Sequence, residues 1–207
     1  MRVALFGATG PTGKFLIDQA LELGCQVVVY GRNASKVNVR NDAVTLIPGQ
    51  LDDPAAIAEA ISGADAVISA LGPGFKSPPG NVIARGTENI IKGMKLGGVK
   101  RLIQISTIAI SDERGKMNLI NFVYSLVAKN TYDDVRETAR VIRQSGLDWT
   151  IARVPRLYDG PVTGNLKIGY KGLTPRTMKL SRGNLVKFIF RQLTETTYSQ
   201  QTPGLSN

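Results

Sequence analysis

Three glycines near the start of the chain, Gly7, Gly10 and Gly13, have a spacing that suits a diphosphate-binding turn. An apolar run precedes them at 3–6, and an apolar pattern of helical period follows at 14–23. The first glycine permits the turn, the second lets backbone approach phosphate, and the third lets helix pack on strand. Free N–H groups and the positive end of the helix dipole then face the anion. We predict a dinucleotide site whose other turn residues are Thr9, Pro11 and Thr12.

The end of the second apolar run, 26–30, indicates which dinucleotide fits. A carboxylate at this place hydrogen-bonds the ribose 2′-hydroxyl of NAD, whereas a cation accommodates the 2′-phosphate of NADP. The stretch 31–36 contains no acidic residue but does contain Arg32 and Lys36. Arginine can hold a phosphate in a bidentate fork. We therefore predict a preference for NADP(H), the alternative being that Arg32 is an ordinary surface arginine.

Further cofactor candidates follow the third and fourth apolar runs, 43–47 and 66–71. Ligands of open α/β sheets bind at the carboxyl ends of the strands, so residues at these ends are expected near the dinucleotide. One of them, Asp52, has a structural alternative, because it can cap the helix that begins near Pro54. These candidates are Leu51, Asp52, Ala70, Leu71 and Gly72.

Two hydroxyl residues, Ser106 and Thr107, end the fifth apolar run and are the predicted catalytic residues, with strand-end hydrogen bonding as the alternative. A tyrosine with a lysine four residues later would relay a proton to a carbonyl. None of the six tyrosines has that lysine; Tyr132 with Arg136 is the nearest approach. A permanently charged guanidinium cannot relay protons, so alcohol–ketone chemistry through Tyr132 is only an alternative.

Composition excludes several classes of function. The 207 residues are 43% hydrophobic and 20% charged, which suits one globular domain spanning 1–207. With no histidine and one cysteine, Cys25, we predict no metal site and a plain core thiol in a reducing cytoplasm. The chain has no apolar segment of bilayer length, and its first apolar run is too short for a signal peptide. We predict a cytoplasmic protein without a membrane span.

Strand and helix patterns alternate along the chain, which predicts a doubly wound parallel sheet, a Rossmann fold, with helices on both faces. Residues 154–180 interrupt the alternation with glycines and prolines, and we interpret them as a small substrate-side lobe. Asp133 or Asp134 is expected to cap the fourth helix, and the polar tail after Glu195 is expected to be loosely held. The expected strands are 3–6, 26–30, 43–47, 66–71, 101–106 and 149–153, and the expected helices are 14–23, 54–61, 81–96, 132–144 and 181–193.

Positive charge is concentrated in the second half of the chain. The net charge is +10, and nine basic residues lie from Arg153 to Arg191 with only Asp159 opposing them. Such a field attracts anions, although a solvated cationic face is the alternative. The aromatic residues of this region follow no RNA-binding motif, so nucleic acid is not an expected partner.

The glycine turn, Gly-Ala-Thr-Gly-x-Thr-Gly, resembles that of the extended and atypical short-chain dehydrogenases/reductases, a group that includes NmrA-like proteins. Nearly the whole chain is similar to the flavin reductase/biliverdin-IXβ reductase family. The segment 159–164, Asp-Gly-Pro-Val-Thr-Gly, is the more specific part of this likeness. The other matching segments are 6–13, 86–91, 94–95, 145–147, Pro155 and 191–193.

The resemblance implies that NADPH passes a hydride directly to a flavin or linear tetrapyrrole, without a tyrosine–lysine pair. It implies that Leu51 and Asp52 flank the adenine, and that the stretch 70–72 flanks the nicotinamide ribose. It also places Pro155 at the nicotinamide and Thr107 near the acceptor. By the same resemblance, Val135 and Arg156 stand where the mammalian member of the family has histidines that border its acceptor pocket.

We therefore predict an NADPH-dependent reductase of flavins or similar planar, anionic acceptors, with Arg156 and Tyr158 binding the acceptor. Flavin (FMN or riboflavin) is here a substrate and not a prosthetic group. The alternative is a redox sensor or assembly factor that binds NADP(H) without turnover. The expected oligomeric state is a monomer or weak dimer, and the apolar stretch 117–128 fits a buried helix, a lid or a dimer face.

Overall fold

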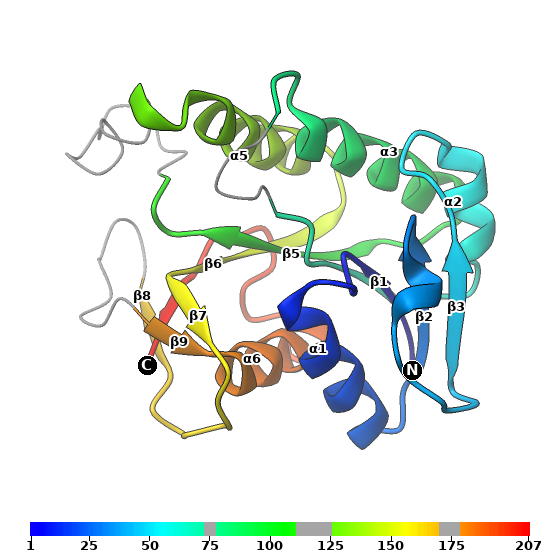
Figure 1. Cartoon of the computed structure of the whole chain (residues 1–207), viewed down its shortest axis with the longest axis horizontal. Helices are drawn as coiled ribbons and strands as arrows, with labels where there is room; N and C mark the ends of the chain where they lie inside the picture. The colour runs from blue at the N-terminus through cyan, green and yellow to red at the C-terminus, as the bar shows by residue number, and fades with distance from the viewer. Residues whose placement is uncertain (73–77, 111–125, 170–178) are drawn as a thin grey trace.

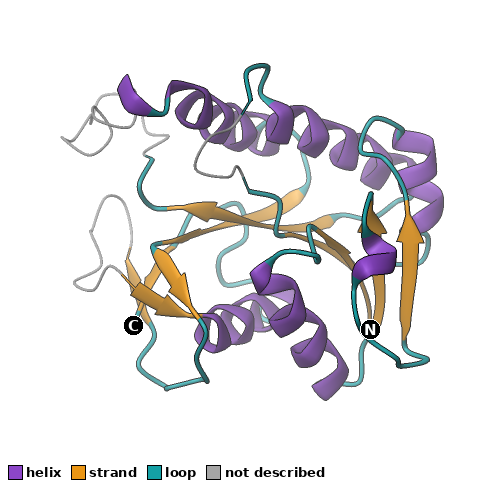
Figure 2. Ribbon diagram, viewed as in Figure 1, coloured by secondary structure: helices purple, strands orange, loops and turns teal. Residues whose placement is uncertain are grey.

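An extended, mainly parallel sheet with helices on both faces forms the centre of the molecule (Figures 1 and 2). The computed structural model describes residues 1–72, 78–110, 126–169 and 179–207. Most of the apolar stretch 117–128 therefore lies outside the described residues. The predicted fold class, a doubly wound Rossmann sheet, is confirmed.

Six parallel strands are ordered β3-β2-β1-β4-β5-β6, and two short strands extend the sheet beyond β6. The first of these, β10 (Gly204–Ser206), pairs parallel to β6, and the second, β8 (Lys167–Gly169), pairs antiparallel to β10. Most of the predicted strands agree with the observed ones to within about one residue. The six parallel strands are β1 (Arg2–Phe6), β2 (Gln26–Gly31), β3 (Val44–Pro48), β4 (Ala66–Ser69), β5 (Arg101–Thr107) and β6 (Asp148–Val154).

The helices divide between the two faces of the sheet (Figure 2). Helices α1 (Pro11–Glu22) and α6 (Arg182–Thr194) pack together on one face. Helices α2 (Pro54–Ala60), α3 (Val82–Leu96) and α5 (Lys129–Arg143) form a row on the other. Each face has its own apolar core cluster, as expected when both sides of a parallel sheet are covered.

The observed helix caps correct three expectations. Helix α1 begins at Pro11 and not at residue 14, because Gly10 is its N-cap and proline suits the first helical position. Helix α2 is capped by Asp53, whose carboxylate accepts hydrogen bonds of 3.0 Å from two backbone N–H groups, so the proposed capping by Asp52 is wrong. Neither Asp133 nor Asp134 caps α5, which begins before both of them.

The C-terminal segment is part of the sheet, which corrects the expectation of a loosely held tail. Beyond α6 the chain returns along β6: Ile151 N donates to Gln201 O at 3.0 Å, and Arg153 N donates to Pro203 O at 2.9 Å. Leu205 of β10 is fully buried. A polar sequence can be held this way because strand pairing uses backbone groups and requires few apolar side chains.

The predicted lobe 154–180 contains short strands in its described part. Strand β7 (Arg156–Tyr158) pairs parallel with β9 (Lys179–Ser181) in a separate two-stranded sheet (Figure 1). Strand β8, from the same region, joins the main sheet through β10. The lobe is therefore held both by the main sheet and by β9, which leads directly into α6.

Candidate functional site

Two cavities lie where the strand order reverses between β1 and β4, the place where open α/β sheets bind ligands. The smaller one, of about 120 Å³, lies at the ends of β1 and β2, and we call it the β2 hollow. The larger one, of about 370 Å³, lies at the ends of β4 and β5, and we call it the β5 cavity. The residue after β4, Leu71, lines both of them.

The three glycines of the turn between β1 and α1 have different surroundings. Gly7 has a φ of +75°, and a Cβ there would lie 2.8 Å from the carbonyl carbon of Ala70. A Cβ on Gly13 would lie 1.7 Å from the carbonyl oxygen of Ala8, so this glycine allows α1 to pack on the turn. A Cβ on Gly10 would meet only Gly7 O, at 3.4 Å. The middle glycine therefore faces open space on the side where a phosphate would approach.

The β2 hollow brings together residues from four separate segments of the chain. It is bordered by the glycine turn, by the end of β2, by Leu51 after β3 and by Leu71 after β4. Arg32 lines it and is exposed, as a partner for a 2′-phosphate has to be. The predicted cofactor residues that meet here are Gly7, Thr9, Arg32, Leu51 and Leu71.

Lys36 and Asp52, two more of the predicted cofactor residues, line neither of the two cavities. Lys36 is exposed at the end of the short 3-10 helix η1 (Ala34–Lys36). Asp52 lines a different depression, between α2 and the ends of β2 and β3, which it shares with Asp53 and Glu59. The roles of Lys36 and Asp52 at the cofactor remain predictions.

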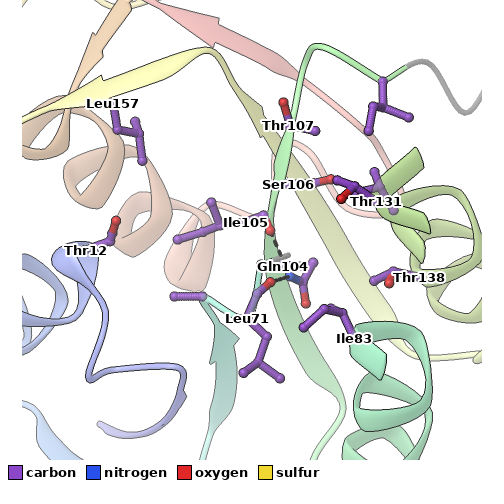
Figure 3. Close-up of a pocket in the computed structure, with 14 residues that line it drawn as sticks. Thr12, Leu71, Ile83, Gln104, Ile105, Ser106, Thr107, Thr131, Thr138 and Leu157 are labelled. Carbon is purple, nitrogen blue, oxygen red and sulfur yellow. Dashed lines mark hydrogen bonds between the residues drawn. The ribbon is translucent and has the colours of Figure 1, made fainter. Parts of the chain in front are cut away.

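The β5 cavity is enclosed by residues from both faces of the sheet (Figure 3). Thr12 reaches it from the first turn of α1, and the three residues 70–72 after β4 border it. In Figure 3, Thr12, Ile105 and Leu157 lie on one side of β5, while Gln104, Ser106 and Thr138 lie on the other. The predicted residues that meet here are Thr12, Ala70, Leu71, Gly72, Ser106 and Thr107.

Gln104 is a lining residue that the sequence prediction missed. Its side chain is 1% exposed, and its Nε2 donates to Leu71 O at 2.9 Å and to Ile105 O at 2.8 Å. Because both partners are acceptors, the amide orientation is fixed, and Oε1 has no hydrogen-bond partner among the described residues. Its position two residues before Ser106 on a parallel strand was the available signal, because alternate residues share a face. The wall of the β5 cavity thus includes a buried amide oxygen that has no hydrogen-bond donor among the described residues.

The hydroxyl groups of the β5 cavity differ in whether they already make hydrogen bonds within the protein. Thr107 Oγ1 accepts a hydrogen bond from Ala109 N at 3.1 Å, and Thr138 Oγ1 donates to Asp134 O at 2.8 Å. Ser106 makes no side-chain hydrogen bond to any described residue, so its hydroxyl can serve a ligand. The described residues that line the cavity include no ionisable side chain.

The predicted acceptor-binding residues, Arg156 and Tyr158, are not among the described residues that line the β5 cavity, whereas Leu157 between them is. Successive residues of a strand point to opposite faces. Because Leu157 faces the cavity, Arg156 and Tyr158 face away from it. Tyr158 instead accepts a hydrogen bond from Asn207 Nδ2 at 2.6 Å. The predicted nicotinamide neighbour, Pro155, is buried between β6 and β7.

Tyr132 also lies outside the described lining of the β5 cavity. Its hydroxyl accepts a hydrogen bond of 2.9 Å from Arg136, whose guanidinium carbon lies 5.3 Å from the ring centre. Tyr132 packs with Ile110 and Val135 in a small apolar cluster. These two partners line the β5 cavity, whereas Tyr132 does not. The geometry gives no support to Tyr132 as the acid.

Asp134 fixes the wall that α3 and α5 form together. Its carboxylate is fully buried and accepts hydrogen bonds from Ile83 N at 3.1 Å and Ala84 N at 2.8 Å. It therefore caps α3 from the neighbouring helix, while the N-cap residue Asn81, at a φ of 51°, provides no side-chain cap. Ile83 lines the β5 cavity, so this bond sets the position of one of its walls.

Two groups, at opposite ends of β2, have raised pKa values. Tyr30, which lines the β2 hollow, donates its hydroxyl to Gln50 O at 2.9 Å, and burial together with Asp53 and Asp52 raises its pKa. Burial also raises the pKa of Cys25, which packs in the core cluster beneath α1. A buried thiol with a raised pKa is a poor nucleophile, which agrees with the prediction of a core thiol.

A family model described as NAD(P)H-binding matches residues 7–196. The matched range begins at the first glycine of the turn and ends just beyond α6. The chain belongs to this NAD(P)H-binding family. The match confirms the prediction of an NAD(P)H-binding chain.

Solved structures of low sequence identity share this fold. A short-chain dehydrogenase/reductase of the wide type from Veillonella parvula, in complex with NADP, has a TM-score of 0.81 and 22% identity, covering 100% of this chain and 94% of that one. The anaerobilin reductase ChuY from Escherichia coli O157:H7 has a TM-score of 0.77 and 20% identity, covering 99% and 96%.

Curated relatives are longer than this chain. The photosystem II assembly factor Ycf39 of Synechocystis is 23% identical over 214 residues, which is 98% of this chain and 61% of the relative. A chloroplastic protein of Arabidopsis thaliana is 29% identical over 181 residues, 80% of this chain and 62% of the relative. The chain thus spans about three fifths of the length of these relatives. None of the described helices combines the length and apolar character needed to cross a membrane.

For a member of this family, the described residues fit a dinucleotide in two respects. The first turn of α1 has no side-chain cap, and the helix dipole there favours an anion such as a diphosphate. The open side of Gly10 gives the diphosphate room, and Arg32 supplies a cation at the β2 hollow. A nicotinamide cofactor bound here would supply a hydride at the ends of β4 and β5.

Proposed function

We propose that this chain is an NADPH-dependent reductase that transfers a hydride directly to a flavin or a similar planar acceptor. The observation that carries the proposal is the β5 cavity, which extends from Thr12 of the glycine turn to Ser106 and Thr107 of β5. A cofactor on the turn and an acceptor at β5 would therefore share one space. Such proximity, with the reacting groups held in orientation, is the main source of rate in a direct hydride transfer.

The neutral lining of the β5 cavity supports an acceptor that needs no proton from the protein. A carbonyl acceptor requires a positioned acid, and the described lining supplies hydroxyls and an amide only. A flavin can take a hydride at N5 and obtain its proton from water. Ser106, with its free hydroxyl, would then orient the ring, and Thr107 would border it.

Gln104 supports an acceptor that carries a ring N–H. Within the described part of the chain its buried Oε1 has no hydrogen-bond partner, and an unpaired buried acceptor costs about 1–3 kcal/mol. A ligand N–H would remove this cost, and the flavin ring has one at N3.

A second candidate function is an NADP(H)-binding redox sensor or assembly factor without turnover. The likeness to the assembly factor Ycf39 extends over 98% of this chain, and the described lining lacks an acid or base. Turnover of NADPH with an acceptor distinguishes the two candidates.

The deciding experiment is NADPH consumption at about 340 nm with FMN, riboflavin and a quinone offered separately, and with NADH as the control donor. We expect steady oxidation of NADPH with a flavin and weak oxidation of NADH. Tight binding of NADPH without oxidation by any of the three would refute the reductase proposal and favour the sensor.

Comparison of riboflavin with N3-methylriboflavin tests the proposed contact to Gln104. Methylation removes the N–H donor and leaves the reacting N5 unchanged. We expect the KM to rise at least about tenfold, which corresponds to the loss of one hydrogen bond of roughly 1.4 kcal/mol. Equal KM values for the two flavins would remove Gln104 from the acceptor site and leave the flavin proposal standing.

A further inference from the structure

Arg182 joins the start of α6 to the glycine turn. Its Nε lies 3.4 Å from Thr12 Oγ1, and its side chain is only 14% exposed. The guanidinium also pairs through Nη1 with Asp159, a carboxylate that is 75% exposed. A largely buried cation thus lies beside the diphosphate turn with its carboxylate partner mostly in water.

The glycine turn carries no charge of its own. The seven residues 7–13 are all uncharged, and the first charged residue after them, Lys14, is exposed and pairs with Asp18 on the outside of α1. Backbone N–H groups can hold a diphosphate, but its two negative charges also favour a nearby cation. Arg182 is a cation in contact with a residue of this turn.

The surroundings of Arg182 favour an anion stronger than Asp159. Arg182 occupies the first position of α6, where the helix dipole opposes a positive charge. Helix α1 packs beside α6 and also begins here, at Pro11 (Figure 1). The carboxylate of this ion pair is 75% exposed, so water weakens the attraction and a diphosphate at the turn can replace Asp159.

Asp159 belongs to a segment that is tied to α6. Gly183 N donates to Gly160 O at 3.0 Å, and Ser181 Oγ donates to Pro161 O at 2.9 Å. A Cβ on Gly183 would lie 2.5 Å from the carbonyl carbon of Pro161, so the segment and the helix start are in close contact. The carboxylate of Asp159 is therefore kept within reach of Arg182.

We infer that Arg182 binds the diphosphate of the dinucleotide and that Asp159 competes with the diphosphate for it. In the free protein the carboxylate holds the guanidinium beside Thr12. When the diphosphate occupies the turn, the guanidinium turns to the phosphate oxygens and releases Asp159. This inference rests on dinucleotide binding and not on the identity of the hydride acceptor.

Calorimetric titration of NADP⁺ into the full chain tests the inference. The two single variants are expected to change the Kd in opposite directions. Arg182→Gln should raise the Kd at least about tenfold, the loss expected for one charge-assisted hydrogen bond. Asp159→Asn should lower the Kd several-fold, because the competitor is removed. In the double variant the benefit of Asp159→Asn should disappear, since it acts through Arg182.

Arg191→Gln is the matched control for net charge, because Arg191 lies in the last turn of the same helix and pairs there with Glu195. We expect it to leave the Kd within about twofold. If Arg182→Gln does not fold, Asp159→Asn still tests the inference, because a purely structural ion pair would not tighten binding when broken. An unchanged or weakened affinity in Asp159→Asn, or an unchanged affinity in Arg182→Gln, overturns the inference.

A ligand without a diphosphate locates the contact. For 2′-AMP we expect Arg182→Gln to leave the Kd unchanged, whereas for NADP⁺ it raises the Kd. Equal losses for both ligands would contradict the assignment to the diphosphate. NADP⁺ binding requires no turnover, so a chain that binds NADP⁺ but reduces no acceptor would refute the reductase proposal alone.

Discussion

At the scale of single residues, the cations around the dinucleotide turn lie at different parts of the predicted cofactor site. Arg32 lines the β2 hollow, Arg182 touches Thr12 on the other side of the turn, and Lys36 lies outside the hollow lining. A charge that directly contacts a phosphate changes affinity far more than a charge in the surrounding solvent. Each of these cations can therefore be tested by a single substitution.

Arg32→Gln should weaken NADPH binding and leave NADH binding nearly unchanged. The physical reason is that only NADPH carries the 2′-phosphate, and a charge-assisted hydrogen bond contributes about 1.5–3 kcal/mol. We expect the Kd for NADPH to rise about ten- to a hundredfold in fluorescence titration. Arg140→Gln, at a surface ion pair with Glu137 on α5, is the control and should change the Kd less than about twofold. Equal effects of Arg32→Gln on NADPH and NADH would contradict the assignment of Arg32.

Tyr30 should make the protein sensitive to alkali. Because the pKa of Tyr30 in the folded protein is raised above its ordinary value of 10.0, folding favours the neutral phenol. This contribution is fully present below pH 10 and is lost as the pH rises through 10 toward the raised value. Urea unfolding between pH 9 and 11 should show a shallower fall in unfolding free energy for Tyr30→Phe. A parallel pH profile for both proteins would contradict this.

At the scale of elements, α3 and α5 are joined by a carboxylate that serves the neighbouring helix. Asp134 and Asp133 are adjacent in sequence but differ in environment: Asp134 is fully buried against the start of α3, and Asp133 pairs with Lys129 at the surface. Helix geometry explains the difference, because successive residues are turned about 100° from one another. The pair is a matched test of what the shared cap contributes.

Asp134→Ala should lower the free energy of unfolding by about 2 kcal/mol, since it leaves two N–H groups of α3 without a partner. Asp133→Ala should change it by less than about 0.5 kcal/mol. Urea denaturation of both variants measures the difference. Similar losses for the two would mean that the cap across the helices contributes little.

At the scale of the whole molecule, β10 at the end of the chain extends the sheet, and Arg101 of β5 holds both α6 and the segment that follows it. Arg101 of β5 donates from Nε and Nη2 to Gln192 O of α6, at 3.2 and 3.0 Å, and from Nη2 to Thr150 Oγ1 at 2.7 Å. Thr150 Oγ1 in turn donates to Tyr198 O at 2.7 Å. Burial lowers the pKa of Arg101, a shift that Asp148 partly offsets. The segment after α6 is thus tied to the centre of the sheet.

Leu205→Ala should therefore cost about 3 kcal/mol, as for other leucines that are fully buried in a core. For a chain of this size, the midpoint of thermal unfolding should fall by about 6–12 °C. Leu96→Ala is the control, because Leu96 at the end of α3 is 70% exposed and should change stability little. A midpoint that is unaffected by Leu205→Ala would mean that β10 does not contribute to the stability of the fold.

The sequence by itself determined the sheet, the glycine turn and the cofactor class. Parallel strands covered on both faces are continuous apolar runs, so β1 to β6 could be recognised locally. The glycine turn, Arg32 and the hydroxyls at the end of β5 are also local patterns, and the structure gathers them at two adjoining cavities.

Only the tertiary structure decided the features that depend on residues far apart in sequence. Asp134 caps a helix that begins about fifty residues earlier, and the polar tail enters the sheet through backbone pairing. Which residue of β7 faces the cavity depends on register, and there Leu157 replaces the predicted Arg156. The free acceptor of Gln104 depends on the position of Leu71 O, which the local sequence does not specify. These features arise because hydrogen bonds and strand register are satisfied across the fold and leave no periodic pattern in the chain.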